Sequence, residues 1–176
     1  SAVNSGLKIK DAIYDLRLIE PIRIKDKLNK TCELVPNHEY LDTGFSSIYM
    51  SRNRVRSWEE PSFTIQAGGR HAPLHPQANK MIFVEKDKRI FDPLSPQPYR
   101  RLSVRECARI QTFPDNFKFK YDYINNGYKM VGNAVPVNLA YALAQKIFRD
   151  IQEYLTTGTC NNLRKLECAK QLTLLN

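Results

Sequence analysis

The chain has 176 residues, of which 42% are hydrophobic and 10% are aromatic, and this composition excludes an intrinsically disordered polymer. Lysine and arginine number 27 against 18 aspartate and glutamate residues, so the formal net charge is +9. Such an excess is typical of a solvated basic surface or of a protein that binds a polyanion such as nucleic acid.

The sequence also bears on membrane and redox chemistry. No apolar run approaches the roughly 20 residues that a membrane-spanning helix needs. The four cysteines form no CxxC pair and no cluster with histidine; they are Cys32, Cys107, Cys160 and Cys168. We therefore expect a cytoplasmic protein with neither disulfides nor a metal site. Because the chain opens on Ser1 without a methionine, we also expect it to be a piece of a longer protein.

The first predicted elements are a short helix and a series of short strands. Apolar residues recur at helical spacing in residues 7–16, and Pro21 lies just beyond. The pattern then changes to short runs broken by turn residues. Three of these runs have the β-branched and aromatic content of strands, at residues 46–52, 62–67 and 80–86. Stretches rich in proline and glycine predict two irregular loops, at residues 68–77 and 92–98.

A capped helix is predicted next, at residues 104–111. Ser103 and Glu106 have the spacing of a capping box, in which each side chain accepts one free backbone N–H. The helix should stop before the following proline. Its apolar residues point inward, whereas Arg105 and Arg109 lie four apart on a separate face, where solvation or structural salt bridges are usual.

A long helix is predicted from Pro136 to about Leu155. Proline suits the first turn of a helix, and leucine or isoleucine repeats every fourth residue from Leu139 to Ile151. The apolar face of this helix needs a large surface to bury against. The tail that follows, residues 156–176, should begin with a turn and add at most a short helix.

Two stretches resemble motifs of the cytosine-5 DNA methyltransferases. "RRLSVRECARIQTFPD" (residues 100–115) resembles motif IX of that family, and "GYKMVGNAVPVNLAYALA" (residues 127–144) resembles motif X. Four further stretches are similar to the target-recognition region of the HaeIII-type enzymes, which modify GGCC; they are "PNHEY", "MSRNRVRSW", "PSFTIQAGGR" and "LHPQA". "IKDAIYDL" is similar to the helix before that region, and the similarity reaches to about Phe148.

The resemblance implies a mixed α/β fold in which a small, irregular, β-rich recognition domain faces the DNA major groove. The flanking helices would complete a Rossmann-like catalytic domain that binds S-adenosylmethionine. Residues 1–20 would end a segment of the catalytic domain, and residues 21–125 would form the recognition domain with the motif IX helix. Residues 126–176 would return to the catalytic domain through motif X and the long helix.

The segments that carry out chemistry in this family are missing from the sequence. In the family the target cytosine is flipped out, and a cysteine thiolate adds to its ring, which makes the neighbouring carbon nucleophilic toward the cofactor's methyl group. The glycine-rich cofactor loop, the Pro-Cys motif and the Glu-Asn-Val motif are not found, and no cysteine follows a proline. We therefore expect the carboxy-terminal half of an enzyme, as a subunit or a fragment, without a catalytic residue. Cys107 is expected to be a small core residue.

Arginines in the central segment are the candidate base readers. The planar guanidinium matches the two acceptors on the major-groove edge of guanine. By resemblance, this role is assigned to Arg52, Arg54 and Arg70, and residues 52, 54 and 56 would share one face if the segment were extended. Supporting or backbone contacts are assigned to Arg56, Gln66, Gly68, Gly69 and His71. The alternative is a basic strand that contacts phosphates only.

Motifs X and IX suggest two further sets of residues. In the family, motif X lines the cofactor pocket from the far side, which corresponds to Asn133 and Ala134; the alternative is a plain turn at the entry to the next helix. The motif IX residues are expected to organise the recognition domain through salt bridges and backbone contacts. They are Arg100, Arg105, Glu106, Arg109 and Gln111.

The resulting hypothesis is the DNA-recognition half of a cytosine-5 methyltransferase that modifies GGCC in double-stranded DNA within a restriction–modification system. It would act on nucleoid DNA in a bacterial cytoplasm, with S-adenosylmethionine as cofactor and with a larger chain that carries the catalytic motifs. The alternative is a non-catalytic DNA-binding protein derived from such an enzyme. A restriction endonuclease is disfavoured because the sequence has no metal-binding carboxylate cluster.

Overall fold

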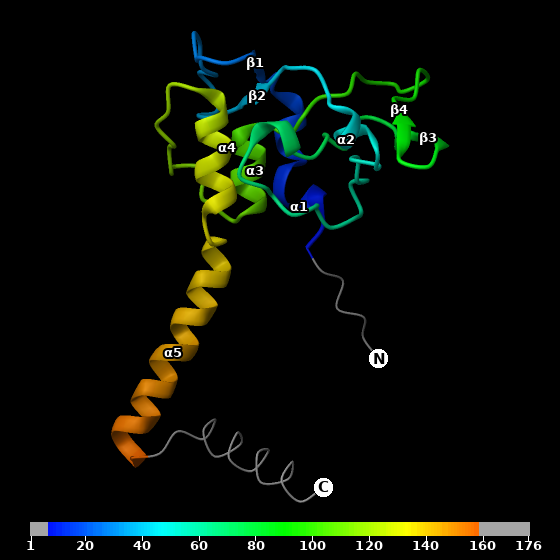
Figure 1. Cartoon of the computed structure of the whole chain (residues 1–176). Helices are drawn as coiled ribbons and strands as arrows, with labels where there is room; N and C mark the ends of the chain where they lie inside the picture. Colours follow the sequence, from blue (N-terminus) through cyan, green and yellow to red (C-terminus); the bar gives the residue numbers. More distant parts are fainter. Residues whose placement is uncertain (1–6, 159–176) are drawn as a thin grey trace, which may run out of the picture. The chain divides into compact units, whose positions relative to one another are not determined.

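The computed structural model describes residues 7–158 of the chain. The chain divides into two units, one ending at Val135 and the other beginning at Pro136. The first unit combines short helices with two small sheets, and the second contains one long helix (Figure 1). The mixed helix-and-sheet class predicted from the sequence is therefore confirmed.

The elements of the first unit are short. Its helices are α1 (Ile9–Ile13), α2 (Ser47–Met50), α3 (Val104–Ile110) and α4 (Ile124–Asn133). Its strands are β1 (Ile22–Ile24), β2 (Glu39–Leu41), β3 (Ile82–Glu85) and β4 (Lys88–Ile90). Two turns of 3-10 helix complete the list, η1 (Asp15–Leu18) and η2 (Gly69–His71).

Helix α1 and the turn η1 together occupy the first predicted helix. Asp11 accepts a hydrogen bond from the backbone N–H of Lys8 at 2.9 Å and so satisfies a free donor at the helix start. Ile9, Ile13 and Leu16 are all buried. The amphipathic spacing in the sequence thus predicted the buried face correctly.

The two sheets differ in direction. β1 and β2 are parallel, with Ile22 opposite Glu39 and Ile24 opposite Leu41, and the sequence pattern does not indicate this pair. β3 and β4 form an antiparallel hairpin around Asp87, whose φ of 58° is left-handed. The strand predicted at residues 80–86 is confirmed as β3.

The strand predicted at residues 46–52 is wrong. These residues form helix α2 and the turn that follows it. The hydroxyl of Ser46 accepts the backbone N–H of Tyr49 at 3.2 Å and caps the helical turn. A local cap therefore outweighs the strand propensity of the isoleucine and tyrosine in this stretch.

The strand predicted at residues 62–67 is also wrong, because these residues form no strand and the end of this stretch instead contacts helix α4. A Cβ on Gly132 of α4 would lie 2.4 Å from the carbonyl oxygen of Gln66, so this glycine lets the helix contact the loop backbone directly. The two irregular loops predicted at residues 68–77 and 92–98 are confirmed; the first contains η2.

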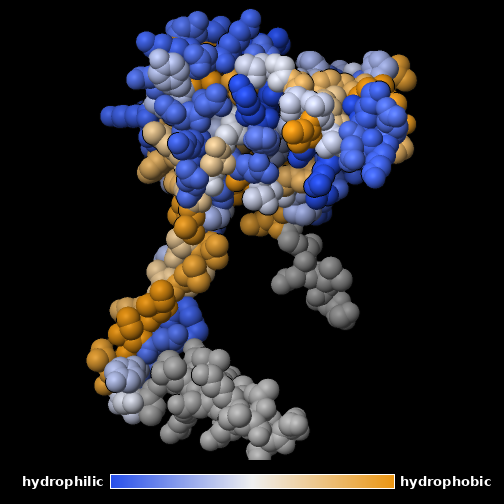
Figure 2. Space-filling model, in the orientation of Figure 1, coloured by the Kyte–Doolittle hydropathy of each residue, from blue (hydrophilic) through white to orange (hydrophobic). Residues whose placement is uncertain are grey.

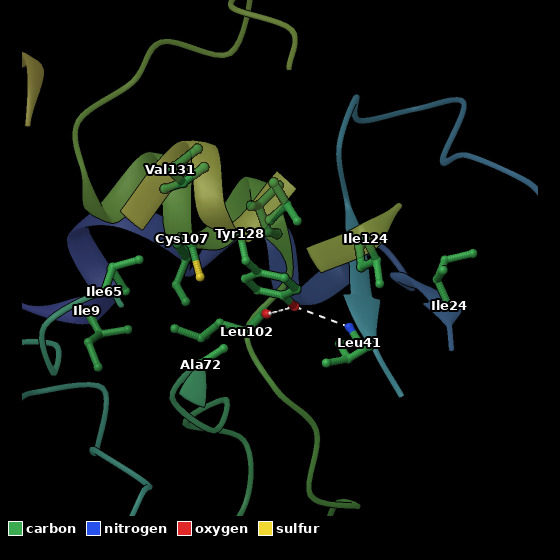
Figure 3. Packing of buried hydrophobic residues seen from close by; sticks show 14 residues of the cluster. Ile9, Ile24, Leu41, Ile65, Ala72, Leu102, Cys107, Ile124, Tyr128 and Val131 are labelled. Carbon is green, nitrogen blue, oxygen red and sulfur yellow. Dashed lines mark hydrogen bonds between the residues drawn. The ribbon is translucent and has the colours of Figure 1, made fainter. Parts of the chain in front are cut away.

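The core of the first unit lies where α1, α3 and α4 pack together (Figure 3). The hydroxyl of Tyr128 donates to the carbonyl oxygen of Leu102 at 2.6 Å and accepts the backbone N–H of Leu41 at 3.2 Å. Cys107 is fully buried in the same cluster, and burial raises the pKa of its thiol well above the usual range. The prediction that Cys107 is a core residue is confirmed.

Helix α3 begins at the predicted capping box. The hydroxyl of Ser103 accepts the backbone N–H of Glu106 at 3.1 Å, and the Glu106 carboxylate accepts the backbone N–H of Ser103 at 2.7 Å. The helix ends at Ile110 with Gln111 as its C-cap, and Thr112 then adopts a left-handed φ of 61°. The predicted end differs from the observed end by one residue.

The second unit, as far as Gly158, consists of α5 (Val137–Thr157). Pro136 precedes the helix, and Gly158 ends it with a left-handed φ of 65°. The long predicted helix is confirmed. No residue of α5 is buried, and Figure 2 shows hydrophobic side chains along its length. The rest of the predicted tail, residues 159–176, lies outside the described residues.

Two negative findings apply to residues 7–158. No helix in that range is long and apolar enough to cross a membrane. No group of three histidine, cysteine, aspartate or glutamate side chains in the same range could hold a metal ion.

Candidate nucleic-acid interface

Three chain segments that carry candidate site residues lie side by side in the first unit. Val55 forms a parallel bridge with Leu74, and Leu74 forms an antiparallel bridge with Arg101. The backbone N–H of Leu74 donates to the carbonyl oxygen of Arg54 at 3.0 Å. The arginine-rich segment, residues 52–56, is therefore held beside the loop of residues 68–77, which is called the glycine loop below. The glycine loop is in turn held beside the start of motif IX.

Tyr49 connects the arginine-rich segment to the glycine loop. Its hydroxyl donates to the carbonyl oxygen of Ala72 at 2.7 Å, and the side chain is only 1% exposed. The guanidinium of Arg54 lies 4.8 Å from the centre of the Tyr49 ring, and its Nε donates to the Tyr49 carbonyl oxygen at 2.9 Å. Arg54 is thus oriented by the same tyrosine that fixes the loop at Ala72.

The three arginines at positions 52, 54 and 56 do not share one extended face. Arg52 lies in the bend after α2, and only Val55, between the other two arginines, forms an isolated β-bridge. Arg52 is exposed and makes no hydrogen bond or ion pair within residues 7–158. Arg56 is instead paired with Glu60 at 3.1 Å and lies over the ring of Phe63 at 4.2 Å. Each arginine therefore has a different environment.

The glycine loop presents one free arginine. Arg70, within η2, is exposed and makes no hydrogen bond or ion pair to any described residue. Gln66 and His71 are also exposed. These three side chains are accessible to a ligand, as a role in DNA binding requires.

The two glycines of this loop have different environments. A Cβ on Gly69 would lie 2.8 Å from the ring of Tyr128 and 2.9 Å from a methyl group of Leu41, so packing alone requires glycine there. Gly68 has an extended backbone, and a Cβ built on it would meet no atom within 4 Å. Close packing in the core therefore explains Gly69 but not Gly68.

Arg101 is a candidate site residue that the sequence patterns did not indicate. It is 2% exposed, and its guanidinium donates to the carbonyl oxygens of Leu41, Thr43 and Gly44 at 2.7–3.1 Å. The guanidinium also lies 4.1 Å from the centre of the Phe45 ring. Burial lowers the pKa of Arg101. Arg101 thus fixes the loop between β2 and α2, and its place in the "RR" pair before the capping box is the only local signal for it.

Motif IX is stabilised by a buried ion pair. Arg100 donates two hydrogen bonds to Glu106, each of 2.8 Å, and both side chains are buried. Burial alone would raise the pKa of Glu106, but the charge and hydrogen bonds of Arg100 outweigh it and lower that pKa to about 2. The carboxylate therefore stays ionised inside the unit.

The next two motif IX arginines differ from each other. Arg105 is fully buried rather than solvated, and it donates to the carbonyl oxygens of Pro36 and Phe117 at 2.8 and 2.7 Å. Arg109 forms ion pairs of 2.6 Å with both Asp15 and Asp115. Gln111 donates to the carbonyl oxygen of Val131 at 3.4 Å. All these contacts join α3 to neighbouring segments of the same unit.

The motif X residues lie at the end of α4. Gly132 and Asn133 belong to the last turn of α4, and the bend before the long helix falls at Ala134. Asn133 is exposed and borders a surface hollow with Asn126, Lys129 and Met130. The half-buried Ala134 is the C-cap of the helix. The exposed amide of Asn133 is therefore accessible to a ligand in this hollow.

Comparison with known proteins supports the resemblance seen in the motifs. The family model "C-5 cytosine-specific DNA methylase" matches residues 5–149. The chain is 63% identical over 153 residues to the Type II methyltransferase M.MthTI of Methanothermobacter thermautotrophicus, covering 87% of the chain and 46% of that protein. It is 55% identical over 140 residues to the Type II methyltransferase M.FnuDI of Fusobacterium nucleatum, covering 79% and 41%.

A third relative, the Type II methyltransferase M.NgoPII of Neisseria gonorrhoeae, is 48% identical over 147 residues, which are 83% of the chain and 42% of the relative. The chain thus spans less than half the length of these three relatives. Because the family model covers most of the sequence, the chain belongs to the C-5 cytosine-specific DNA methylase family.

Proposed function

We propose that the chain is the DNA-recognition part of a DNA (cytosine-5-)-methyltransferase of a restriction–modification system. It would direct methyl transfer from S-adenosylmethionine to a cytosine in a GGCC site of cytoplasmic DNA. The cofactor loop and the catalytic cysteine would come from a larger polypeptide, either as a partner chain or as the rest of the same protein. Family membership, and relatives named Type II methyltransferases, support this proposal.

The observation that carries the proposal is the arrangement of arginines around Tyr49. Arg54 is oriented on the Tyr49 ring, and the Tyr49 hydroxyl binds the loop that carries the unpaired Arg70. A guanidinium held in a defined direction can donate to both acceptors of a guanine, which a freely moving lysine does not do as selectively. Each correct contact would contribute roughly 1–3 kcal/mol of discrimination between bases. Arg52 is the third proposed base reader.

The motif X residues fit one wall of a cofactor pocket. S-adenosylmethionine supplies the methyl group when it is bound. The exposed amide of Asn133 can both donate and accept hydrogen bonds, and Ala134 has no bulky side chain to fill the space beside it. The opposite wall would come from the Rossmann-like domain that the partner segment supplies.

The exposed apolar residues of α5 support the need for such a partner. Leu139, Leu143, Ile147 and Ile151 are each 51–58% exposed. Exposure of so many large apolar side chains on one helix is unfavourable in water, at about 25 cal/mol for each Å² left uncovered. We propose that the catalytic domain covers this helix.

The alternative is a non-catalytic DNA-binding protein. The residues up to Val135 form a unit with its own hydrophobic core, so this unit could bind DNA without taking part in methyl transfer.

The decisive experiment is methyl transfer from labelled S-adenosylmethionine to a GGCC duplex. It is run with this chain alone and then with a polypeptide that supplies the cofactor loop and catalytic motifs. Activity that appears only in the mixture, and not with this chain by itself, would support a recognition subunit. A scrambled duplex is the control for specificity. Salt-sensitive DNA binding by the chain without any activity in the mixture would favour the non-catalytic alternative.

A further inference from the structure

A positively charged hollow lies beside the proposed base-reading loop. It has a volume of about 540 Å³ and is bordered by the loop between β2 and α2, by the first turn of α4 and by η2. Three cationic side chains and one carboxylate line it, along with neutral polar groups. The polar lining residues are Lys25, Asp26, Thr43, Ser46, Arg70, Arg101 and Asn125.

The buried cation on this wall has no carboxylate partner. The hydrogen bonds of Arg101 go to three backbone carbonyl oxygens, and its Nε has no acceptor. No ion pair joins Arg101 to a carboxylate within residues 7–158. Burying a guanidinium without a counter-charge is costly, and an anion in the adjoining hollow would offset that cost.

The other two cations leave the hollow more positive. Lys25 and Arg70 are exposed, and neither forms an ion pair within the part of the chain that the structure describes. Arg70 and Arg101 both line the hollow, so their guanidinium groups add like charges to it. Asp26 offsets one of the three positive charges.

The start of α4 adds backbone N–H groups, which carry partial positive charge, to the border of the hollow. α4 has ten residues, and its N-cap, Tyr123, provides no side-chain cap. The backbone N–H of Asn125 makes no hydrogen bond within residues 7–158. The positive end of the helix dipole therefore reinforces the basic side chains.

We propose that this hollow is an anion site that takes a backbone phosphate of the DNA duplex. The inference rests on the proposed function, because it assigns the phosphate next to the bases that Arg70 reads. Lys25 contacts the phosphate directly, and the buried Arg101 supplies a fixed positive charge from the wall of the hollow. The site positions the duplex on the glycine loop but carries no sequence information of its own.

The test is the salt dependence of duplex binding by the full chain. Lys25→Gln is compared with Lys27→Gln, an exposed lysine two residues along that does not line the hollow. We expect Lys25→Gln to weaken binding of a GGCC duplex and of a scrambled duplex by the same factor, about 5- to 10-fold near 0.1 M salt. The slope of log K against log salt should fall in magnitude by about 0.9. Lys27→Gln should change the slope less.

A second arm separates a DNA phosphate from a free phosphate ion. Inorganic phosphate is compared with chloride at equal ionic strength for its effect on the Tm of the chain. A phosphate-specific rise that Lys25→Gln abolishes supports an anion site. The same rise without a change in the DNA salt slope would overturn the DNA assignment.

The proposal also fails if Lys25→Gln and Lys27→Gln change the salt slope equally. That result leaves the proposed function intact as long as Arg54→Ala still loses discrimination between the two duplexes. If the unmodified chain binds neither duplex, alone or with the catalytic polypeptide, the proposed function itself is wrong.

Discussion

At the scale of single residues, Tyr49 determines how the candidate interface is held together. Its ring supports Arg54, and its hydroxyl binds the carbonyl oxygen of Ala72. These two contacts come from different parts of one side chain, so they can be separated by a substitution that removes only the hydroxyl group.

Tyr49→Phe should keep the ring under Arg54 and lose the bond to Ala72. We expect a loss of about 1 kcal/mol in the free energy of unfolding, as for a single buried hydrogen bond. Affinity for the GGCC duplex should fall more than affinity for the scrambled duplex, because the loop carrying Arg70 is no longer fixed. Denaturant unfolding and competition binding measure the two effects. Tyr123→Phe, at an exposed tyrosine, is the control; equal effects of the two substitutions would contradict this role for Tyr49.

Arg54 and Arg56 allow a direct test of base reading against backbone contact. Arg54→Ala should reduce affinity for the GGCC duplex by roughly 1–3 kcal/mol and change affinity for a scrambled duplex much less. Arg56 is engaged with Glu60, so Arg56→Ala should alter both affinities to a similar, smaller extent. Equal loss on both duplexes from Arg54→Ala would mean that this arginine contacts phosphate only.

The residue types at the candidate site were predictable, but their environments were not. The sequence indicates a basic segment and a glycine pair, and the structure shows that the basic segment lies beside the loop after the glycine pair. It does not reveal that Arg56 forms an ion pair with Glu60, or that Arg101 is buried against three carbonyl groups. The environment of Arg101 depends on a chain segment 60 residues away, at Leu41, whereas Arg56 pairs with Glu60 four residues along on the same segment.

At the scale of elements, predictions succeeded where the signal was local. The capping box of Ser103 and Glu106 fixed the start of α3, and the fourfold spacing of apolar residues fixed α5. The strand predicted at residues 62–67 is absent, and no sequence signal indicates that Gly132 of α4 contacts the backbone of Gln66 there. Helix α4 was not predicted, because its sequence contains asparagine and glycine, which are weak helix formers. Gly127 is nevertheless needed in this helix, because a Cβ there would lie 2.7 Å from the Tyr121 ring.

The ion pair at the start of α3 should be essential for stability. Glu106→Gln removes the buried carboxylate and leaves the Arg100 guanidinium without its counter-charge. We expect a loss of about 3–5 kcal/mol in the free energy of unfolding. Glu59→Gln, at an exposed carboxylate paired with Lys8, should cost far less. Chemical denaturation measures both, and comparable losses would contradict the importance of burial.

Acid should destabilise the unit through the buried histidines beside this pair. His75 faces Glu106, Arg100, His38 and Gln77, and burial lowers its pKa to about 4 despite the attraction of Glu106. Burial also lowers the pKa of His38, whose Nε2–H donates to the carbonyl oxygen of Ile19 at 3.1 Å. Both folded-state pKa values lie below those of the unfolded chain. As pH falls, the unfolded state therefore takes up protons first.

The free energy of unfolding should consequently fall between about pH 6.5, the ordinary histidine value, and about pH 4. His75 would contribute on the order of 3 kcal/mol to this loss. Glu106 extends the loss below pH 4.5, because its lowered pKa stabilises the fold only while it is ionised. His75→Gln should flatten the pH dependence, whereas His71→Gln, at an exposed histidine, should not. An unchanged slope in His75→Gln would show that His75 is not the titrating group.

At the scale of the whole molecule, the two units have opposite character. The residues up to Val135 bury a continuous core, whereas α5 buries nothing of its own. A helix with this many exposed apolar side chains is stabilised mainly by packing against another surface rather than by helix propensity. Its partner therefore decides whether recognition is coupled to methyl transfer.

Substitutions on α5 should consequently affect activity without affecting the first unit. The double substitution Leu143→Gln and Ile147→Gln removes two apolar side chains that are 52% and 58% exposed. Glutamine favours helix at least as well as isoleucine, so the helix itself should persist. We expect binding to the catalytic polypeptide to weaken by at least tenfold and methyl transfer in the mixture to fall with it. DNA binding by the chain alone should be unchanged.

Gln145→Ala, two residues from both positions and on another side of the helix, is the matched control. A similar loss in that variant would mean that α5 does not present its apolar side to the partner.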